Sequence, residues 1–258
     1  MNLEIDGLRV MISAGANGIG LEIARAFVRE GARVHVCDVD PGAIARLGAS
    51  DAGITATVCD VADRDQVALF FEQGIAKLGG LDCLVNNAGI AGPTGRVEAL
   101  DPAEWDRCIA IDLTGQFNCV RLAVPHLRKS SNASVMNVSS LAGRLGFALR
   151  TPYAAAKWGV IGLTKSLAIE LGGDGIRVNA LLPGLVAGER QKRVLTAKAQ
   201  ARGISFEEME STALSFTSLK EYVTPQQLAD LVVFIASPRG RTTSGQALSV
   251  CGDTQMLG

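Results

Sequence analysis

The stretch LRVMISAGANGIGLEIARAFV, residues Leu8 to Val28, decides the fold of this chain. It begins with the short apolar segment Leu8 to Ile12, which predicts a buried strand. The glycine-rich loop Ser13 to Gly20 follows, and apolar residues then recur with the spacing of one helix face at Ile23, Ala24, Phe27 and Val28. A helix that starts directly after such a loop points its amino terminus at a phosphate, while the glycines let the backbone approach closely. The stretch therefore predicts a phosphate-binding loop between a strand and a helix.

The next predicted strand, Arg33 to Cys37, ends at Asp38, about 20 residues beyond the glycine loop. A carboxylate at this position can accept hydrogen bonds from both hydroxyls of an adenosine ribose, and it repels the 2′-phosphate of NADP. Val39 offers no compensating cation, and Asn17 in the loop is not basic. We therefore expect NAD to be the preferred cofactor. The alternative is that Asp38 is a solvated aspartate at a strand end.

Strands and helices alternate along the whole chain, with no linker, repeat or low-complexity segment. The later predicted strands are short apolar segments that end at Asp60, at Asn86-Asn87-Ala88-Gly89, at Ser139-Ser140 and at Pro183-Gly184, with a last one at Ala247 to Cys251. This alternation calls for an α/β fold in which helices cover both faces of a parallel sheet. With 258 residues, of which 48% are hydrophobic, we expect a single domain, residues 1–258.

The segment Ser134 to Leu171 combines the strand ending at Ser139-Ser140 with a helix. Thr151 can cap this helix and Pro152 can be its first residue, since proline lacks an amide hydrogen where the helix would leave that donor unpaired. Tyr153 and Lys157 would then lie one turn apart on one helix face.

Tyr153, Lys157 and Ser140 are the candidate acid–base residues. A phenol titrates near pH ~10, so it serves as a base at neutral pH only where a cation such as Lys157 stabilises the phenolate. Ser140, at the carboxyl end of its strand, can donate a hydrogen bond to a substrate oxygen. Together they can form an acid–base site without histidine. The alternative is an ordinary exposed Tyr-Lys pair on a helix.

Composition restricts the possible functions. Lys and Arg number 25 and Asp and Glu 26, a net charge of −1 that gives no support for binding nucleic acid or an anionic membrane. The six cysteines lack Cys-x-x-Cys spacing, and only two histidines are present, so a metal site or a Ser-His-Asp hydrolase is not expected. Reduced thiols, together with the lack of a leader and of a long apolar run, favour a cytoplasmic protein.

Residues 187–222 form a long polar segment beside a strand end and predict a substrate lid with two weak helices. We expect the walls of the substrate pocket to come from Ala91 to Thr94, Leu141 to Arg150 and this lid. Arg144, Arg150 and Arg190 near these segments suggest a negatively charged substrate. The alternative is that these arginines lie in solvent or at subunit contacts.

Taken together, the glycine loop, Asp38, Asp60, Asn86-Asn87-Ala88-Gly89, Ser140, Tyr153-x-x-x-Lys157 and Pro183-Gly184 resemble the short-chain dehydrogenase/reductase family over essentially the whole chain. The resemblance implies a single Rossmann-type, doubly wound parallel sheet of about seven strands. It also implies a homotetramer, or a homodimer, built through the long helices and the last strand.

The resemblance further implies that Tyr153 is the acid or base, that Ser140 positions the reacting oxygen and that Lys157 holds the nicotinamide ribose. Asp60 would meet the adenine, and Asn87 the ribose beside it. The full set of implied cofactor-binding residues is Ser13, Gly15, Asn17, Gly18, Ile19, Gly20, Asp38, Asp60, Val61, Asn87, Ala88, Gly89, Tyr153, Lys157, Pro183, Gly184 and Val186.

Two positions depart from the family's pattern. The glycine motif usually begins Thr-Gly, whereas Ser13-Ala14-Gly15 places the glycine one position later; we expect the loop to survive, because Ala14 adds only a methyl group. The family's active-site asparagine, which holds a water linked to the lysine, is replaced by Asp112. A carboxylate there would stabilise the Lys157 ammonium and partly cancel its effect on Tyr153. Alternatively, Asp112 points away and bonds the helix backbone.

Two functions are compatible with these residues. The first is an enzyme that transfers hydride between NAD and a secondary alcohol or its ketone, with a polyol, sugar or hydroxy acid as possible small-molecule substrate. The second is a protein that binds NAD for regulation or assembly and has lost the chemistry. Intact Ser140, Tyr153 and Lys157 favour the enzyme.

Overall fold

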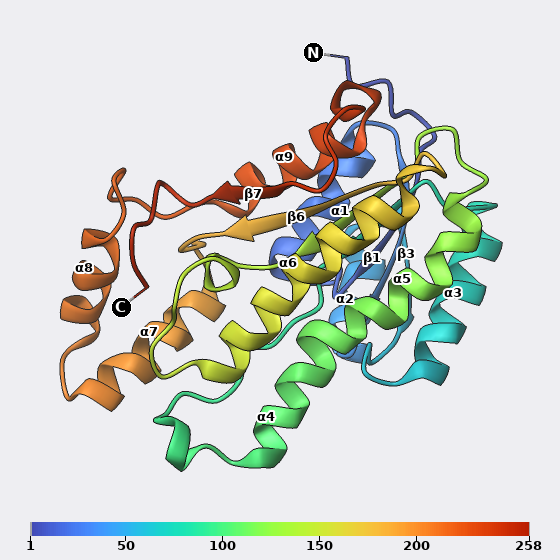
Figure 1. Cartoon of the computed structure of the whole chain (residues 1–258). Helices are drawn as coiled ribbons and strands as arrows, with labels where there is room; N and C mark the ends of the chain where they lie inside the picture. The colour runs from blue at the N-terminus through green and yellow to red at the C-terminus, as the bar shows by residue number, and fades with distance from the viewer. Residues whose placement is uncertain (1, 258) are drawn as a thin grey trace.

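The computed structural model describes residues 2–257; the end residues of the predicted domain, 1 and 258, lie outside the described part. Within residues 2–257, one sheet of seven parallel strands has the order β3-β2-β1-β4-β5-β6-β7 (Figure 1). In its register, Ile12 on β1 pairs with Val36 on β2 and with Val85 on β4. The predicted doubly wound parallel sheet of about seven strands is confirmed.

The strands are β1 (Arg9–Ser13), β2 (Arg33–Asp38), β3 (Ile54–Val58), β4 (Cys83–Asn86), β5 (Ser134–Val138), β6 (Arg177–Pro183) and β7 (Ala247–Val250). The helices are α1 (Gly18–Arg29), α2 (Pro41–Ser50), α3 (Arg64–Leu78), α4 (Pro102–Ile109), α5 (Gly115–Leu127), α6 (Thr151–Gly172), α7 (Glu189–Arg202), α8 (Phe206–Ser215) and α9 (Pro225–Ala236). A π-helical turn, Ala110–Thr114, joins α4 to α5.

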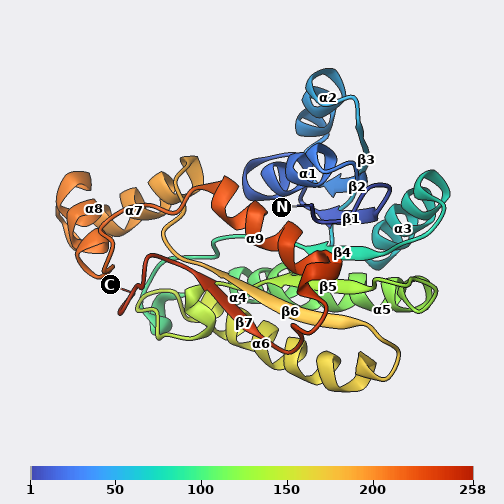
Figure 2. The same ribbon diagram turned by 90° about the horizontal axis from the view of Figure 1, so that it is seen from above.

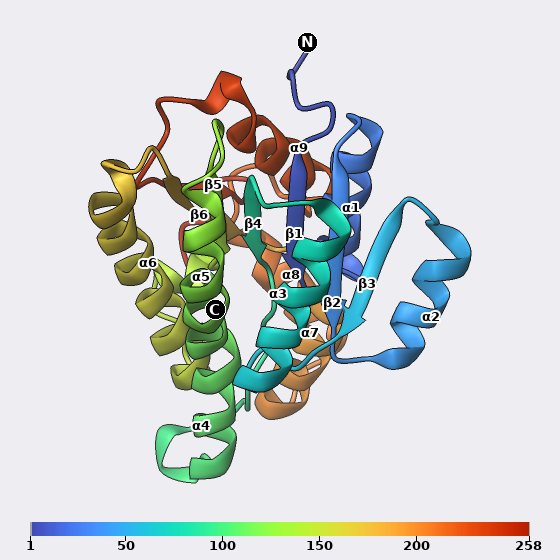
Figure 3. The ribbon, with the colours of Figure 1, turned by 90° about the vertical axis from the view of Figure 1, so that its right-hand side faces the viewer.

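Helices cover both faces of the sheet, and Figure 2 shows the two layers from above. On one face, α1, α2 and α9 pack on the sheet through a core that includes Phe27, Leu47 and Val232. On the other, α3, α5 and α6 pack through a core that includes Phe70 and Leu127. Figure 3 shows α2 and β3 at the outer end of the molecule. Side chains on both faces of such a strand are buried, which explains why each strand is a short run of apolar residues in the sequence.

Local signals fix the helix ends. Ser205 and Thr224 each form a capping box, with Glu208 and Gln227 respectively. One capping expectation is wrong: α6 starts at Thr151 itself, Arg150 is the residue before it, and no side chain caps the helix. Pro152 still occupies the first turn, so Tyr153 and Lys157 remain one turn apart.

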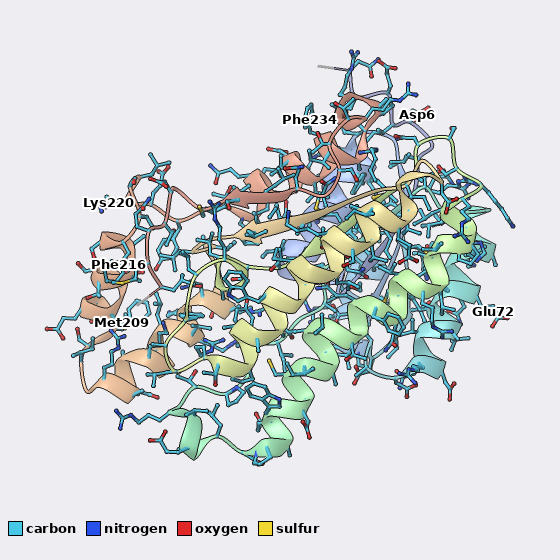
Figure 4. The ribbon with its side chains drawn as sticks, viewed as in Figure 1. Asp6, Glu72, Met209, Phe216, Lys220 and Phe234 are labelled. Atoms are coloured by element: carbon cyan, nitrogen blue, oxygen red, sulfur yellow. The ribbon has the colours of Figure 1, made fainter. Side chains whose placement is uncertain are left out.

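The strands are added outward from the middle of the sheet: β2 and then β3 lie beyond β1 on one side, and β5, β6 and β7 lie beyond β4 on the other. After β3 the chain crosses back to β4, so the loops that follow β1 and β4 part in opposite directions and leave a crevice at the carboxyl ends of the strands. Residues 187–222, predicted as two weak helices, form α7 and α8 at this end. Figure 4 shows Met209, Phe216 and Lys220 together on the α8 side, far from Glu72 on α3. Among residues 2–257, no helix is both long and apolar enough to cross a membrane.

Candidate active site

A cavity of about 690 Å³ lies at the carboxyl ends of the strands, between the loops after β1, β4, β5 and β6 and helix α7. Predicted site residues line it from both ends of the crevice: Asn17, Gly18, Ile19, Asp38, Asn87, Gly89, Ser140, Tyr153, Lys157, Pro183, Gly184 and Val186. The structure thus brings residues that are far apart in the chain to one concave surface. A cavity of this size takes a small molecule or cofactor.

The glycine loop presents the amino terminus of α1 to this cavity. Asn17 precedes the helix without capping it by its side chain, and no acidic residue lies in the first turn. The first amides of α1 are therefore left for another acceptor, and the helix dipole favours an anion there. Gly18 has a positive φ of 54° and open space beside it, whereas a Cβ on Gly20 would lie 2.2 Å from the Ala14 carbonyl oxygen. The loop fits the diphosphate of a dinucleotide.

Ala14 holds the backbone conformation that a glycine would adopt without strain. Its φ is 50°, in the left-handed region, which costs an L-residue about 1–2 kcal/mol. Asn87 fixes the loop by donating from Nδ2 to the carbonyl oxygens of Ala14 (2.9 Å) and Ser13 (3.2 Å). The loop keeps its conformation although Ala14 replaces the glycine, as expected. The reason differs from the expected one, because the hydrogen bonds from Asn87 hold Ala14 in a strained conformation.

Several residues of the predicted cofactor set lie behind the cavity and shape it from there. Ser13 Oγ accepts hydrogen bonds from the amides of Asn87 and Ala88, both at 3.0 Å. Gly15 packs against Val36, where a Cβ would lie 2.6 Å from that side chain. The members of the set that do not line the cavity are Ser13, Gly15, Gly20, Asp60, Val61 and Ala88.

Asp38 stands at the end of β2 with its carboxylate held in place. Its Oδ2 accepts from the amide of Ala16 (3.3 Å) and its Oδ1 from the amide of Asp40 (3.2 Å). The residue is buried and lines the cavity, so it is not a solvated strand-end aspartate. Val39 beside it is largely exposed and uncharged. Any group in this part of the cavity meets a fixed negative charge.

Ser140, Tyr153 and Lys157 line the cavity beyond the glycine loop. Ser140 follows β5, and its Oγ accepts from the amide of Ala142 at 3.1 Å. Lys157 Nζ lies 5.5 Å from the centroid of the Tyr153 ring and donates to the Val138 carbonyl oxygen at 3.2 Å. Lys157 is buried, so this is not an exposed helical pair. A phenol beside a buried ammonium, with a hydroxyl nearby, can exchange a proton with a substrate oxygen.

Residues 13–252 match the model of a family described as enoyl-(acyl carrier protein) reductase, so the match spans almost the whole chain and all the motifs above. The chain belongs to the short-chain dehydrogenase/reductase family. It is 35% identical over 254 residues to 3-oxoacyl-(acyl-carrier-protein) reductase of Thermotoga maritima, covering 97% of this chain and 98% of that one.

The chain is also similar to a dehydrogenase in sequence and to a ketoreductase in structure. Cis-4-hydroxycyclohexanecarboxylate dehydrogenase of Sinomonas cyclohexanicum is 37% identical over 251 residues, with 94% of each chain covered. The crystal structure of an actinorhodin polyketide ketoreductase variant with NADPH superposes with a TM-score of 0.90 at 29% identity, covering 95% of this chain and 96% of that one. As a short-chain dehydrogenase/reductase, the chain is an oxidoreductase of CH–OH and keto groups, and its fold binds a nicotinamide nucleotide.

Asp112, the departure from the short-chain dehydrogenase/reductase pattern, faces Lys157. Its Oδ2 lies 3.3 Å from Lys157 Nζ, and its Oδ1 accepts from the amide of Ile90 at 2.7 Å. The two side chains are 0% and 3% exposed, so water screens the pair very little. Asp112 lies in the π-helical turn, a feature frequent at functional sites. The alternative in which Asp112 points away from Lys157 is wrong.

Sequence reasoning missed part of the substrate end of the cavity. Lys198 on α7 lies within the predicted lid but was not singled out, and Thr254, Met256 and Leu257 near the end of the chain also line the cavity. The predicted wall Ala91 to Thr94 does not line it. Of the three arginines singled out from sequence, Arg150 and Arg190 line the cavity, whereas Arg144 is exposed outside it. No periodic pattern marks these residues, because contacts between distant segments bring them together.

Proposed function

We propose that this short-chain dehydrogenase/reductase oxidises a secondary alcohol to its ketone, or runs the reverse reaction, with NAD as the hydride carrier and Tyr153 as the acid–base residue. The observation that carries the proposal is a single cavity. It is lined at one end by the uncapped amino terminus of α1 and by Asp38, and at the other by Ser140, Tyr153 and Lys157. A nucleotide placed on the loop would reach the three side chains without leaving the cavity.

In this proposal the chain's own residues move one proton. The Tyr153 phenolate takes the proton of the substrate hydroxyl while Ser140 Oγ holds the same oxygen by a hydrogen bond. A bound NAD would supply the acceptor for the hydride of the carbinol carbon, so that the alcohol loses two electrons and becomes a ketone. Lys157 stabilises the negative charge on the phenolate. In the reverse direction Tyr153 returns the proton to the oxygen.

The proposed nucleotide site follows the walls of the cavity. The amides of Gly18 and Ile19 would hold the diphosphate, and the Asp38 carboxylate the adenosine ribose. Pro183, Gly184 and Val186 would lie at the nicotinamide. Asp60 and Val61 do not line the cavity, so an adenine that meets them would extend beyond its wall. The remaining residues of the predicted set would support the loop from behind. NAD is proposed over NADP because of the fixed charge of Asp38.

We propose that residues 1–258 act as one domain whose segment 187–222 closes over the substrate. Helices α7 and α8 pack on each other through Leu195, Ala199 and Met209, a small cluster of their own apart from the main cores. Such a unit can move as one body. A substrate-bound structure in which α7 and α8 keep these positions would exclude closure.

The outer faces of the long helices support the proposed assembly into a homotetramer, or a homodimer. Phe117 on α5 and both Trp158 and Ile169 on α6 are exposed, and Ile169 is 85% exposed. Exposed large apolar side chains such as these can be covered by another subunit. A light-scattering mass equal to the 27.0 kDa chain would exclude assembly. For localisation we propose the cytoplasm, consistent with six free thiols, five of them buried.

The proposed substrate is a polyol, a sugar or a hydroxy acid. The Sinomonas relative is named for a hydroxylated carboxylate, which favours hydroxy acids among them. The test is to follow NADH formation by absorbance across a panel of these alcohols and of apolar secondary alcohols. Turnover of at least one class is expected. Binding of NAD without oxidation of any alcohol, and without reduction of the matching ketones, would instead favour the regulatory alternative.

The pH dependence of oxidation is a prediction that arises from Asp112. The carboxylate stabilises the Lys157 ammonium and cancels part of its pull on the Tyr153 phenolate, because the two side chains are 3.3 Å apart and buried. Replacing Asp112 with Asn removes this opposing charge. The alkaline rise of kcat/KM for alcohol oxidation is therefore expected at lower pH in Asp112→Asn than in the wild type.

The matched control is Asp106→Asn, which removes an exposed charge from α4, just before the π-helical turn. Its pH profile should coincide with that of the wild type. Identical profiles for wild type and Asp112→Asn, or a shift to higher pH, would contradict the role given to Asp112.

A further inference from the structure

Arg150 is a buried cation at the substrate end of the cavity. It immediately precedes α6, three residues before Tyr153, and its guanidinium carbon lies 5.2 Å from the centroid of the Tyr153 ring. The residue is 2% exposed and lines the cavity. Any substrate whose oxygen reaches the phenol therefore also lies close to this positive charge.

The charge of Arg150 is not neutralised by the residues around it. Its guanidinium donates a hydrogen bond to a neutral group, the carbonyl oxygen of Ala91, and its buried Nε has no hydrogen-bond partner among residues 2–257. Asp112, the carboxylate whose charge reaches it, is ion-paired with Lys157 instead. Burial lowers the pKa of Arg150 from its usual range, yet a guanidinium stays protonated in proteins. Because buried charges are normally paired, this guanidinium calls for an anion.

A second cation, Lys198, lies against the Phe147 ring, which Arg150 also contacts. Lys198 Nζ is 4.0 Å from the centroid of the Phe147 ring, and the Arg150 guanidinium carbon is 5.3 Å from it. Lys198 is buried and lines the cavity. Burial, and then the charges of Arg150 and Arg202, lower the pKa of Lys198 to about 8. Both cations therefore lie against the Phe147 ring at this end of the cavity.

We infer that Arg150 binds the carboxylate of the substrate and makes the protein a hydroxy-acid dehydrogenase. The inference rests on the proposed function and names its substrate class. The fork of donors on a guanidinium suits a carboxylate, and the carboxylate whose charge reaches Arg150, that of Asp112, is ion-paired with Lys157. Phe147, whose ring also meets Tyr153 edge-on at 6.4 Å, fixes the guanidinium near the phenol. Among hydroxy acids, those with the carboxylate within a few bonds of the carbinol fit this spacing.

Kinetics on matched pairs tests the inference. Lactate, 3-hydroxybutanoate and longer 3-hydroxy acids are each compared with their primary amides, which keep the shape and lose the charge. For the wild type, kcat/KM for the best acid should exceed that for its amide by roughly 10- to 100-fold, the usual effect of a charge-assisted hydrogen bond. Arg150→Ala should remove this preference mainly through KM for the acid, without changing KM for NAD, and Arg150→Lys should restore part of it.

The control variant is Arg144→Ala, which removes an exposed arginine of the same loop outside the cavity and should keep the full preference. A wild-type preference near one, or an Arg150→Ala variant that loses acid and amide activity equally, would assign Arg150 a structural role and overturn the inference.

Binding without turnover separates this inference from the proposed function. Butanoate and butanamide are titrated by calorimetry into the Tyr153→Phe protein saturated with NAD, and into the same protein with Arg150→Ala added. Butanoate should bind the first protein more tightly than butanamide does, and the second protein should not distinguish them. If this holds while no alcohol is oxidised, the anion site stands and the proposed function fails. If hydroxy acids are oxidised but butanoate shows no dependence on Arg150, the anion site fails and the proposed function stands.

Discussion

Replacing Tyr153 with phenylalanine is expected to lower kcat/KM for the best alcohol of the panel by roughly 1,000-fold, within the usual range for a positioned acid or base. The change removes one oxygen and keeps the ring, whose edge-on contact with Phe147 and position beside Lys157 do not involve the hydroxyl. The cavity should keep its shape. NAD binding, measured by calorimetry, should therefore stay within a few-fold of the wild type.

The matched control is Tyr222→Phe, because the chain has two tyrosines. Tyr222 donates its hydroxyl to Glu210 Oε1 at 2.7 Å and does not line the cavity. This variant should keep activity of the wild-type order. A Tyr153→Phe protein that retains wild-type kcat/KM would remove Tyr153 from the mechanism, and the acid–base site with it.

The second large effect concerns cofactor choice. The wild type is expected to use NAD with a kcat/KM on the order of 100-fold above that for NADP, because a phosphate placed against the buried Asp38 carboxylate meets like charge with little screening. The carboxylate cannot easily turn aside, since the amides of Ala16 and Asp40 hold both its oxygens. Asp38→Ala combined with Val39→Arg should reverse the preference by removing the repulsion and adding a cation.

Asp40→Asn is the control for this change. Asp40 is exposed and caps α2 through its side chain, so asparagine keeps the cap and removes a charge two residues from Asp38. NAD preference should persist in this variant. Comparable efficiency with both cofactors in the wild type would show that Asp38 does not select the nucleotide.

The fold could be predicted from sequence because its signals are local. Each strand that is covered on both faces is a run of apolar residues. The loop from Ser13 to Gly20 requires glycine at particular positions. The same holds for the Tyr153-Lys157 pair, which one helical turn fixes wherever the helix packs. Helix α6 begins at Thr151, one residue before the start predicted at Pro152. This difference is too small to separate Tyr153 from Lys157.

The rest of the site depends on contacts that sequence spacing does not give. The π-helical turn Ala110–Thr114 inserts an extra residue into the helix and changes which way Asp112 faces, so an uninterrupted helical pattern could not place it beside Lys157. Lys198 lies on a helix with many charged residues, where nothing distinguishes it from Lys192 or Arg193. Its burial and its contact with the Phe147 ring distinguish it in the structure.

The measurement that tests the central claim most directly is the fate of the hydrogen on the carbinol carbon. The best alcohol of the panel is prepared with deuterium on that carbon and oxidised by the wild-type protein with NAD, and the NADH is examined by mass spectrometry. Direct hydride transfer predicts one deuterium in each NADH formed and a matching amount of ketone. NADH without deuterium, with the label released to water, would contradict the claim that the protein passes hydride between a secondary alcohol and NAD.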